Sequence, residues 1–150
     1  KKFFFDSIER SYPFIHGYGT GWGKGYIGNE KIPELYSRTQ IGINVHNSLG
    51  PVNGRLYDLA AYGVCQICDN KKQLSQVFKE GHEIIGFDSK KECVDLIRYY
   101  LNNSEEASVI GEAGRERYLR EYTMDNIWRI FFKNIDNYKN YMQIIKREAG

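Results

Sequence analysis

The sequence predicts an α/β domain built on a parallel sheet with flanking helices and a long helix at its carboxyl end. The main observation is the order of segments in residues 41–68: an apolar run, a glycine-containing loop, a helical segment and a second apolar run. This is the order of a βαβ unit, in which a helix crosses between two parallel strands. A third apolar run at 82–87 precedes segments of helical periodicity, which we expect to cover the sheet.

The first strand of this unit is expected at residues 41–46, a β-branched apolar run without charge that is typical of a buried strand. Residues 47–54 are dense in turn formers, so the chain breaks there. Such a loop lies at the carboxyl end of a strand and the amino end of a helix. Open α/β sheets bind ligands at this edge, and the helix dipole there favours a phosphate group.

The crossover helix is expected at residues 55–62, where Leu56, Leu59 and Ala60 recur at helical spacing. Gly63 is a natural helix stop, and residues 64–68 form the second strand.

Other elements are delimited by helix breakers and caps. Pro13 ends a helix, Pro33 suits the first turn of another, and Asp88 or Ser89 caps a third. The further expected elements are helices at 2–11, 32–39, 72–78, 90–101 and 104–122 and strands at 14–17 and 82–87.

The last helix begins after Thr123 and carries an apolar stripe close to a heptad repeat. Its members are Ile127, Phe131, Ile135, Tyr138, Met142 and Ile145. A helix of some 22 residues spans roughly 33 Å, longer than this small sheet needs. We therefore expect its far end to cover a missing domain or a partner chain.

Composition indicates one cytoplasmic globular domain over residues 1–150. A content of 41% hydrophobic residues supports a sizeable core, and a net charge of +2 gives no argument for nucleic acid. Three cysteines indicate a reducing compartment, and we expect neither a signal peptide nor a transmembrane segment. Because the first residues resemble the end of an upstream element, the chain is expected to be a fragment of a longer protein.

The loop at residues 17–25 holds five glycines in nine residues. It does not match a P-loop, because Tyr18 stands at the first glycine position and Gly25 follows the lysine. A dinucleotide pattern ending at Gly28 is present, but no helix follows at once. The favoured interpretation is a substrate-facing loop with Trp22 as its packing anchor.

Several residues of the central unit suit an anionic ligand. His46 ends a strand before the suspected phosphate loop and either touches ligand or acts as a core or capping histidine. Arg55, in the first turn of the crossover helix, opposes the helix dipole and so favours an adjacent anion, unless it pairs with Asp58 three residues on. Asp58 could otherwise reach a ribose hydroxyl.

The Cys65-x-x-Cys68 spacing could be half of a metal or redox site. On a strand, however, residues three apart point to opposite faces, and Cys93 is the one further thiol. Buried structural cysteines are the favoured interpretation.

An ordered series of motifs resembles the GT-B glycosyltransferases, particularly the CgeB-like spore-protein branch related to the group-1 transferases. The central motif is Asn53-x-Arg55-x-Tyr57-Asp58-Leu59-x-Ala61-x-Gly63. Gly19-x-Gly21-Trp22, Tyr26-x-Gly28, Glu34-Leu35-Tyr36 and Ile41-x-Ile43-Asn44 resemble the family's upstream half. Phe78-x-x-Gly81-x-Glu83-Ile84, Tyr99-Tyr100-Leu101, Gly114-x-Glu116-Arg117 and Tyr122-Thr123 resemble its tail.

The resemblance implies the carboxyl-terminal, Rossmann-like half of a two-domain enzyme, which binds a nucleotide-diphosphate sugar against a missing amino-terminal domain. No metal or cofactor is implied, and the catalytic base, unknown here, is expected from the missing domain. The family's ribose-binding glutamate is Asp58 here, and Gly50 stands where group-1 transferases often carry a second glutamate. The substrate-binding residues implied by resemblance and position are Gly21, Trp22, His46, Asn47, Asn53, Gly54, Arg55 and Asp58.

Two other functions stay open at this point. A degenerate transferase half that binds nucleotide without catalysis, or serves as a scaffold, agrees with the shortened Asp58 and with Gly50. A flavodoxin-like regulatory domain has less support, because no acidic cluster ends the first strand.

Overall fold

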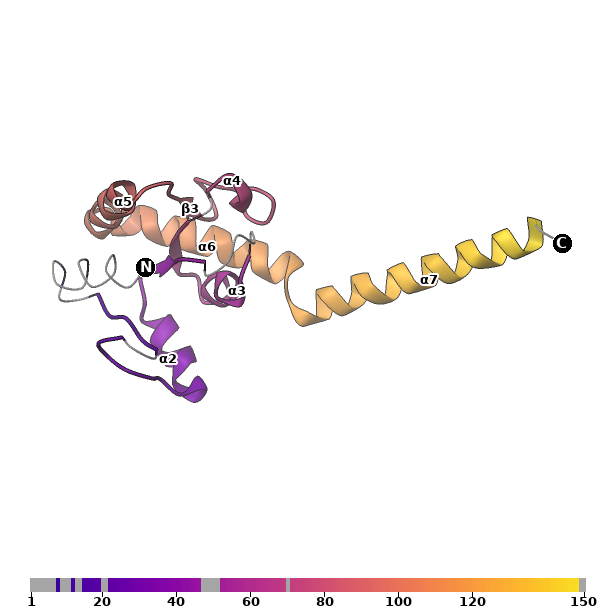
Figure 1. Ribbon diagram of the computed structural model, residues 1–150, viewed down its shortest axis with the longest axis horizontal. Helices are drawn as coiled ribbons and strands as arrows, with labels where there is room; N and C mark the ends of the chain where they lie inside the picture. The colour runs from indigo at the N-terminus through magenta and orange to yellow at the C-terminus, as the bar shows by residue number, and fades with distance from the viewer. Residues whose placement is uncertain are drawn as a thin grey trace.

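The computed structural model describes residues 8, 12, 15–19, 22–46, 52–69 and 71–148. A parallel sheet of three strands in the order β1-β2-β3 forms its centre (Figure 1). The strands are β1 (Ile41–Asn44), β2 (Cys65–Cys68) and β3 (Ile85–Gly86). The predicted α/β class with a parallel sheet is therefore confirmed.

Helices precede, connect and follow these strands. They are α2 (Ile32–Ser37), α3 (Gly54–Ala61), α4 (Lys71–Leu74), α5 (Lys90–Asn102), α6 (Ser104–Glu121) and α7 (Met124–Glu148), with a 3-10 turn, η1 (Asn29–Lys31), before α2. The crossover helix, α5 and α6 agree with the sequence prediction to within a residue at each end, and α7 begins where predicted but has 25 residues instead of some 22.

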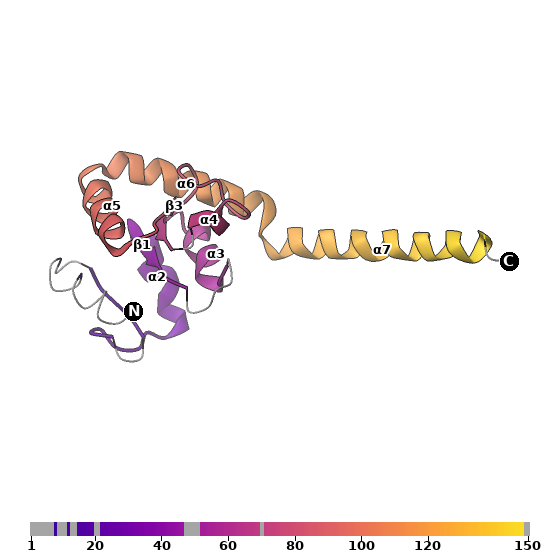
Figure 2. The same cartoon turned by 45° about the horizontal axis from the view of Figure 1, so that its top comes forward.

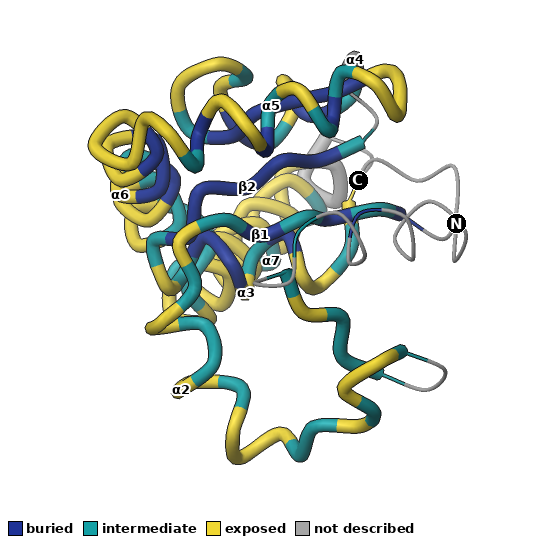
Figure 3. The backbone as a smooth tube through the Cα atoms, turned by 90° about the vertical axis from the view of Figure 1, so that its left-hand side faces the viewer, coloured by how far each residue is buried: buried dark blue, intermediate teal, exposed yellow. Residues whose placement is uncertain are grey.

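Strand β2 separates two apolar clusters because its side chains alternate between the faces of the sheet. Cys65 and Ile67 pack with Cys93 and Ile97 of α5 on one face. On the other face, Cys68 packs in a second cluster formed largely by α3, α4 and the segment after α4. Figure 3 shows the buried strands enclosed between these layers.

Helix α6 crosses the amino ends of the strands and packs closely there at two glycines, Gly111 and Gly114, which we call the glycine seam. A Cβ on Gly111 would overlap the carbonyl group of Gly63, and one on Gly114 would lie 2.6 Å from the carbonyl oxygen of Glu83. Gly63 itself has φ +68°, a left-handed conformation that suits glycine at the end of α3. With α6 across the amino ends, the carboxyl edge of the sheet lies on the opposite side.

Several predicted elements are shorter than expected. The 82–87 strand is reduced to β3, because Gly81 has φ +80° and the backbone N–H groups of His82 and Glu83 turn back to the carbonyl of Lys79. The strand predicted at 41–46 ends at Asn44, and the one at 64–68 begins at Cys65.

The helix predicted at 72–78 is one turn, α4, followed by turns that place Phe78 in the core. Residues 15–17 are not in a strand. The predicted helix at 2–11 lies outside the described residues except for Ile8, which is helical and buried.

Helix α7 leaves the body after Thr123 and projects away from it as a straight arm (Figures 1 and 2). Apolar side chains stand exposed along its length. Within the described residues, no helix is long and apolar enough to cross a lipid bilayer.

Candidate functional site

Buried polar side chains gather at the carboxyl ends of β1 and β2. Asn44, the last residue of β1, is 0% exposed, and His46, two residues further on, is 2% exposed. Asp69 directly follows β2 and is partly buried. Since Asn44 is in register with Cys68, the parallel ladder brings the chain after each strand to one edge.

Asn44 and Asn53 form a reciprocal amide pair. The Asn44 Nδ2 donates to Asn53 Oδ1 at 3.1 Å, and the Asn53 Nδ2 donates to Asn44 Oδ1 at 3.0 Å. Asn53 is also the N-cap of α3, where its side-chain oxygen accepts from the backbone N–H of Leu56 at 3.1 Å. The pair therefore fixes the amino end of α3 against the end of β1.

Arg55 extends this network outward from the amide pair. Its Nη1 donates to Asn44 Oδ1 at 3.4 Å, and its charge acts on the phenol of Tyr36 on α2. Burial raises the pKa of the Tyr36 phenol, an effect opposed by the Arg55 charge and reinforced by that of Asp58. The alternative left open by the sequence, an Arg55–Asp58 salt bridge, does not form between these two described residues.

The α3 amino end carries an open backbone position beside this cation. Among the residues that the structure describes, none lies within 4 Å of where a Cβ on Gly54, the first residue of α3, would stand. Arg55 and Asp58 are both exposed. A helix amino end, open backbone and an arginine together suit an anionic group.

His46 and Asp69 form a hydrogen-bonded dyad. The Nδ1 of His46 lies 2.6 Å from Asp69 Oδ1, and the backbone N–H of His46 donates to the two carboxylate oxygens at 3.0 and 3.1 Å. The Asp69 backbone N–H in turn donates to the carbonyl of Asn44 at 3.2 Å. The carboxylate thus holds the histidine by ring and backbone at once.

Cys68 completes a group of three metal-ligating residue types with this dyad, since their donor atoms lie within 4.8 Å of one another. The shortest separation is the dyad's own hydrogen bond, and the Cys68 sulfur is 4.0 Å from His46 Nδ1. Burial and the neighbouring Asp69 raise the pKa of the Cys68 thiol, whereas a metal requires a thiolate. These contacts fit a hydrogen-bonded dyad beside a protonated thiol better than a metal centre, and the absence of a metal stays a prediction.

The other thiols are core residues. Cys65 and Cys68 lie in different clusters on opposite faces of the sheet, as the strand geometry predicts. Burial raises the pKa of Cys65 and of Cys93 to about 12. The prediction of buried structural cysteines is confirmed.

Of the eight site residues predicted from the sequence, the structure joins Asn53 and Arg55 in one network through Asn44, and Gly54 lies between them as the first residue of α3. His46 lies at the same sheet edge, and Asp58 one turn along α3. Trp22 lies in its own loop, with its backbone N–H on the Gly19 carbonyl. Gly21 and Asn47 lie outside the described residues, so their predicted roles stay predictions.

Sequence reasoning missed Asn44 and Asp69 as members of the site. A signal was present in each case: Asn44 is the polar residue in an apolar strand, and Asp69 directly follows one. Both pair with residues distant in the chain, Asn44 with Asn53 and Asp69 with His46, and strand register decides those pairings.

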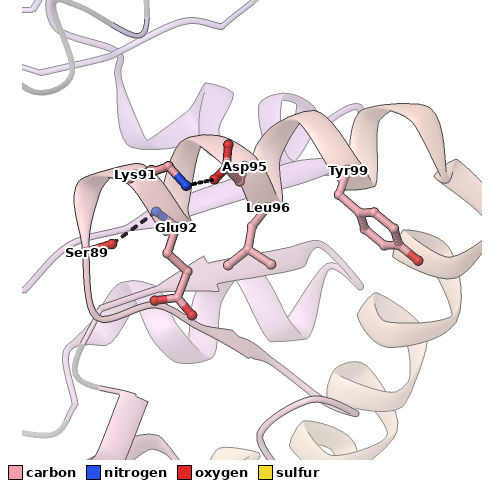
Figure 4. Close-up of a pocket in the computed structure, with 6 residues that line it drawn as sticks. All are labelled: Ser89, Lys91, Glu92, Asp95, Leu96 and Tyr99. Atoms are coloured by element: carbon pink, nitrogen blue, oxygen red, sulfur yellow. Dashed lines mark hydrogen bonds and ion pairs between the residues drawn. The ribbon is translucent and has the colours of Figure 1, made fainter.

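A surface hollow of about 440 Å³ lies along α5 and its cap (Figure 4). Its lining residues are Ser89, Lys91, Glu92, Asp95, Leu96 and Tyr99. Ser89 Oγ accepts from the Glu92 backbone at 3.1 Å, and Lys91 pairs with Asp95 at 3.4 Å. These interactions belong to an ordinary helix cap and an exposed ion pair, so this hollow is a weaker candidate than the sheet edge.

Comparison with known proteins now gives a context for this edge. Residues 1–133 match the model of a family described as glycosyl transferase-like. The fold is similar to that of the Anabaena protein Alr3699/HepE, solved in complex with UDP-glucose, with a TM-score of 0.64 at 10% sequence identity. That match covers 75% of this chain and 31% of the Anabaena chain, so the chain spans about a third of that protein. No curated protein matches the sequence.

Proposed function

Because the chain belongs to the glycosyl transferase-like family, we propose that it is the donor-binding half of a GT-B glycosyltransferase that transfers a sugar from a nucleotide diphosphate to an acceptor. The observation that carries the proposal is the Asn44–Asn53–Arg55 network, which holds a cation and a helix amino end at the carboxyl edge of the sheet. The UDP-glucose bound by the structurally similar Anabaena protein supports a nucleotide sugar as the ligand.

The chemistry of this half is charge stabilisation. When the sugar leaves, negative charge grows on the diphosphate, and a preorganised guanidinium and helix dipole lower the energy of that state. Arg55 already donates to Asn44 without a ligand, which lowers the cost of ordering its long side chain. Asp58 is proposed to reach the ribose hydroxyls, and no metal is needed for these roles.

The proposal includes a missing amino-terminal domain that supplies the acceptor site and the catalytic base. Exposed apolar residues of α7, among them Trp128 and Phe131, provide a surface for it to cover. The CgeB-like assignment, the cytoplasmic location and the inactivity of this chain alone stay predictions from the sequence.

The test is a titration of the chain with UDP, GDP, ADP, CMP and dTDP, followed by two-dimensional amide NMR. Saturable shifts at Gly54, Arg55 and Asp58 are the expected result. Arg55→Ala removes a charge-assisted contact worth about 1.5–3 kcal/mol, so we expect about 10- to 150-fold weaker binding with little change in unfolding free energy. Arg115→Ala on α6, also an exposed arginine, is the matched control and is expected to bind like the parent.

Asp58→Ala should also weaken binding, with Asp95→Ala on α5 as its control. If both site variants bind every nucleotide as well as the parent, the site assignment is wrong.

A non-catalytic nucleotide-binding or scaffold domain is the second candidate, favoured by the shorter carboxylate at Asp58 and by Gly50. The two candidates differ in turnover. The full-length protein would release UDP from UDP-glucose, or another nucleotide from its sugar, only if it is an active transferase.

A further inference from the structure

The His46 ring has a buried nitrogen that the interactions described so far do not use. Its Nε2 is buried and has no hydrogen-bond partner among the residues that the structure describes. The ring's other nitrogen is engaged by Asp69, and the whole side chain is 1% exposed. Buried ring nitrogens are normally paired, so an unpaired one at a candidate ligand-binding edge needs an explanation.

Asp69 determines the chemical character of that nitrogen. A carboxylate only accepts hydrogen bonds, so the hydrogen between His46 Nδ1 and Asp69 Oδ1 belongs to the ring. In a neutral imidazole protonated at Nδ1, Nε2 is an acceptor with a free lone pair. The backbone N–H of His46 donates to the same carboxylate and so helps to hold Asp69 where it meets the ring nitrogen.

An acceptor at this position is suited to a hydroxyl group rather than to a phosphate. Phosphate oxygens at neutral pH offer no hydrogen to a lone pair, whereas sugar hydroxyls do. The cation suited to phosphate, Arg55, lies in the same site: its Nη1 donates to the Asn44 side chain, and the Asn44 carbonyl accepts from the Asp69 backbone N–H. The edge therefore carries an anion-binding element and a separate hydroxyl-binding element.

We propose that His46 Nε2 accepts a hydrogen bond from a hydroxyl group of the donor's sugar, and that Asp69 is the positioning residue that fixes the ring for this contact. The proposal rests on the proposed function, since it assigns part of the same site to the sugar. It also makes His46 a residue that distinguishes the sugar nucleotide from the bare nucleotide.

The first experiment follows the ring nitrogens of ¹⁵N-histidine-labelled chain by long-range ¹H–¹⁵N NMR. His46 is assigned by comparison with a His46→Gln variant, since the sequence has three histidines. In the free chain, Nδ1 is expected to carry the proton and Nε2 none. The opposite tautomer would overturn the proposal without any ligand.

The probes are pairs that differ by the sugar alone: UDP-glucose with UDP, GDP-mannose with GDP, and dTDP-glucose with dTDP. A shift of Nε2 with a sugar nucleotide and not with its bare nucleotide is the expected result. An equal shift with both members of a pair would assign the nitrogen to the diphosphate and overturn the proposal.

Amide shifts at Arg55 without any movement of Nε2 would leave the proposed function intact and refute this inference. No shift at the Arg55 amide or at His46 Nε2 with any pair would count against both the proposed function and this inference.

Asp69→Asn tests the positioning role. An amide can donate as well as accept, so the tautomer is no longer fixed and a mixture should appear. We expect the preference for UDP-glucose over UDP to fall by about 3- to 10-fold, the value of one neutral hydrogen bond, with UDP affinity unchanged. A loss of structure alone would change both affinities together.

Asp88→Asn is the matched control, because Asp88 lies at the same edge two residues beyond β3. It should keep one tautomer and the full preference. Cys68→Ala separates the dyad from a metal centre, since it removes a candidate metal ligand and leaves His46 and Asp69 in place. A sugar preference that is lost in Cys68→Ala, and that in the parent is lost with a chelator and restored by Zn²⁺, would contradict the dyad.

Discussion

The carboxyl edge of the sheet and helix α7 reverse the ordinary pattern of burial in opposite senses. At the sheet edge, polar Asn44 and His46 are almost fully buried. Along α7, Trp128 is 49% exposed and Phe132 57% exposed. Soluble domains normally place such residues the other way round, because burying a polar group costs free energy and burying an aromatic one gains it.

The two regions differ in whether their unusually placed side chains find partners. At the sheet edge, the Asn44 and Asn53 amides satisfy each other, and Asp69 satisfies His46 Nδ1. Aromatic rings of α7 pack on neighbours along the helix, with Trp128 and Phe131 centroids 5.6 Å apart, and stay about half exposed in the described structure. The sheet edge is thus organised before a ligand arrives, whereas these rings of α7 remain largely open to solvent.

The largest expected effect is on the pH dependence of the unfolding free energy. It comes from the buried thiols, which lie in the body and not in α7. Burial raises the pKa of Cys65 and Cys93 from 9.0 to about 12, so the folded chain holds these protons longer than the unfolded chain does. Stability is therefore unaffected below about pH 8 and falls as pH rises between about 9 and 12, by up to about 1.4 kcal/mol per pH unit for each thiol.

Urea unfolding at pH 8, 9 and 10 measures this fall. The Cys93→Ala variant should show a flatter dependence over the same range, since one of the titrating groups is removed. Identical slopes in parent and variant would contradict the assignment of the alkaline loss to buried thiols.

A smaller effect is expected from the amide pair. Asn44→Ala removes both hydrogen bonds of the pair, each worth about 0.5–1.5 kcal/mol, so we expect a loss of about 1–3 kcal/mol of unfolding free energy. A double-mutant cycle with Asn53→Ala should give a coupling energy of about 1 kcal/mol or more, because the two side chains interact directly. Additive single losses in urea unfolding would show that the pair does not stabilise the fold.

The smallest effect on the unfolding free energy is expected from a substitution in α7, although that substitution removes an aromatic side chain. Phe132→Lys should change the unfolding free energy by no more than about 0.5 kcal/mol, because the ring is already exposed in this chain. In the full-length protein, the same change should destabilise the contact with the amino-terminal domain that we propose.

Thermal unfolding of the chain and of the full-length protein separates these two outcomes for Phe132→Lys. Leu74→Lys, at a buried position of the body, is the contrasting variant and should unfold both. A Phe132→Lys variant that destabilises the isolated chain as strongly would show that α7 is already part of its core.

The sequence predicted the fold class because the decisive signals were local. The apolar run of β1, the helical spacing of Leu56 and Leu59, and the stop at Gly63 each act over a few residues. The reduction of β3 was not predicted, since its apolar composition suits a strand while the left-handed turn at Gly81 interrupts pairing. Composition favoured a strand, and backbone geometry limited it.

The candidate site could be predicted only in part for the same reason. Asn53 and Arg55 stand at a helix start, a position that has chemical meaning in the sequence itself. Asn44 and Asp69 acquire their roles through residues 9 and 23 positions away, once the parallel ladder is in register. Such pairings depend on the assembled sheet, and a single sequence does not contain them as a pattern.

The glycine seam of α6 has a mechanical consequence for α7. With no side chains between Gly111 and Gly63, α6 is seated directly on the backbone of the body and gives the arm a firm base. Helix α7 has 25 residues and so a length of about 37 Å. A rotation of roughly 10° at the junction after Tyr122 would move the far end of α7 by about 6 Å. The length of α7 would thus turn a small local rotation into a large displacement of its tip.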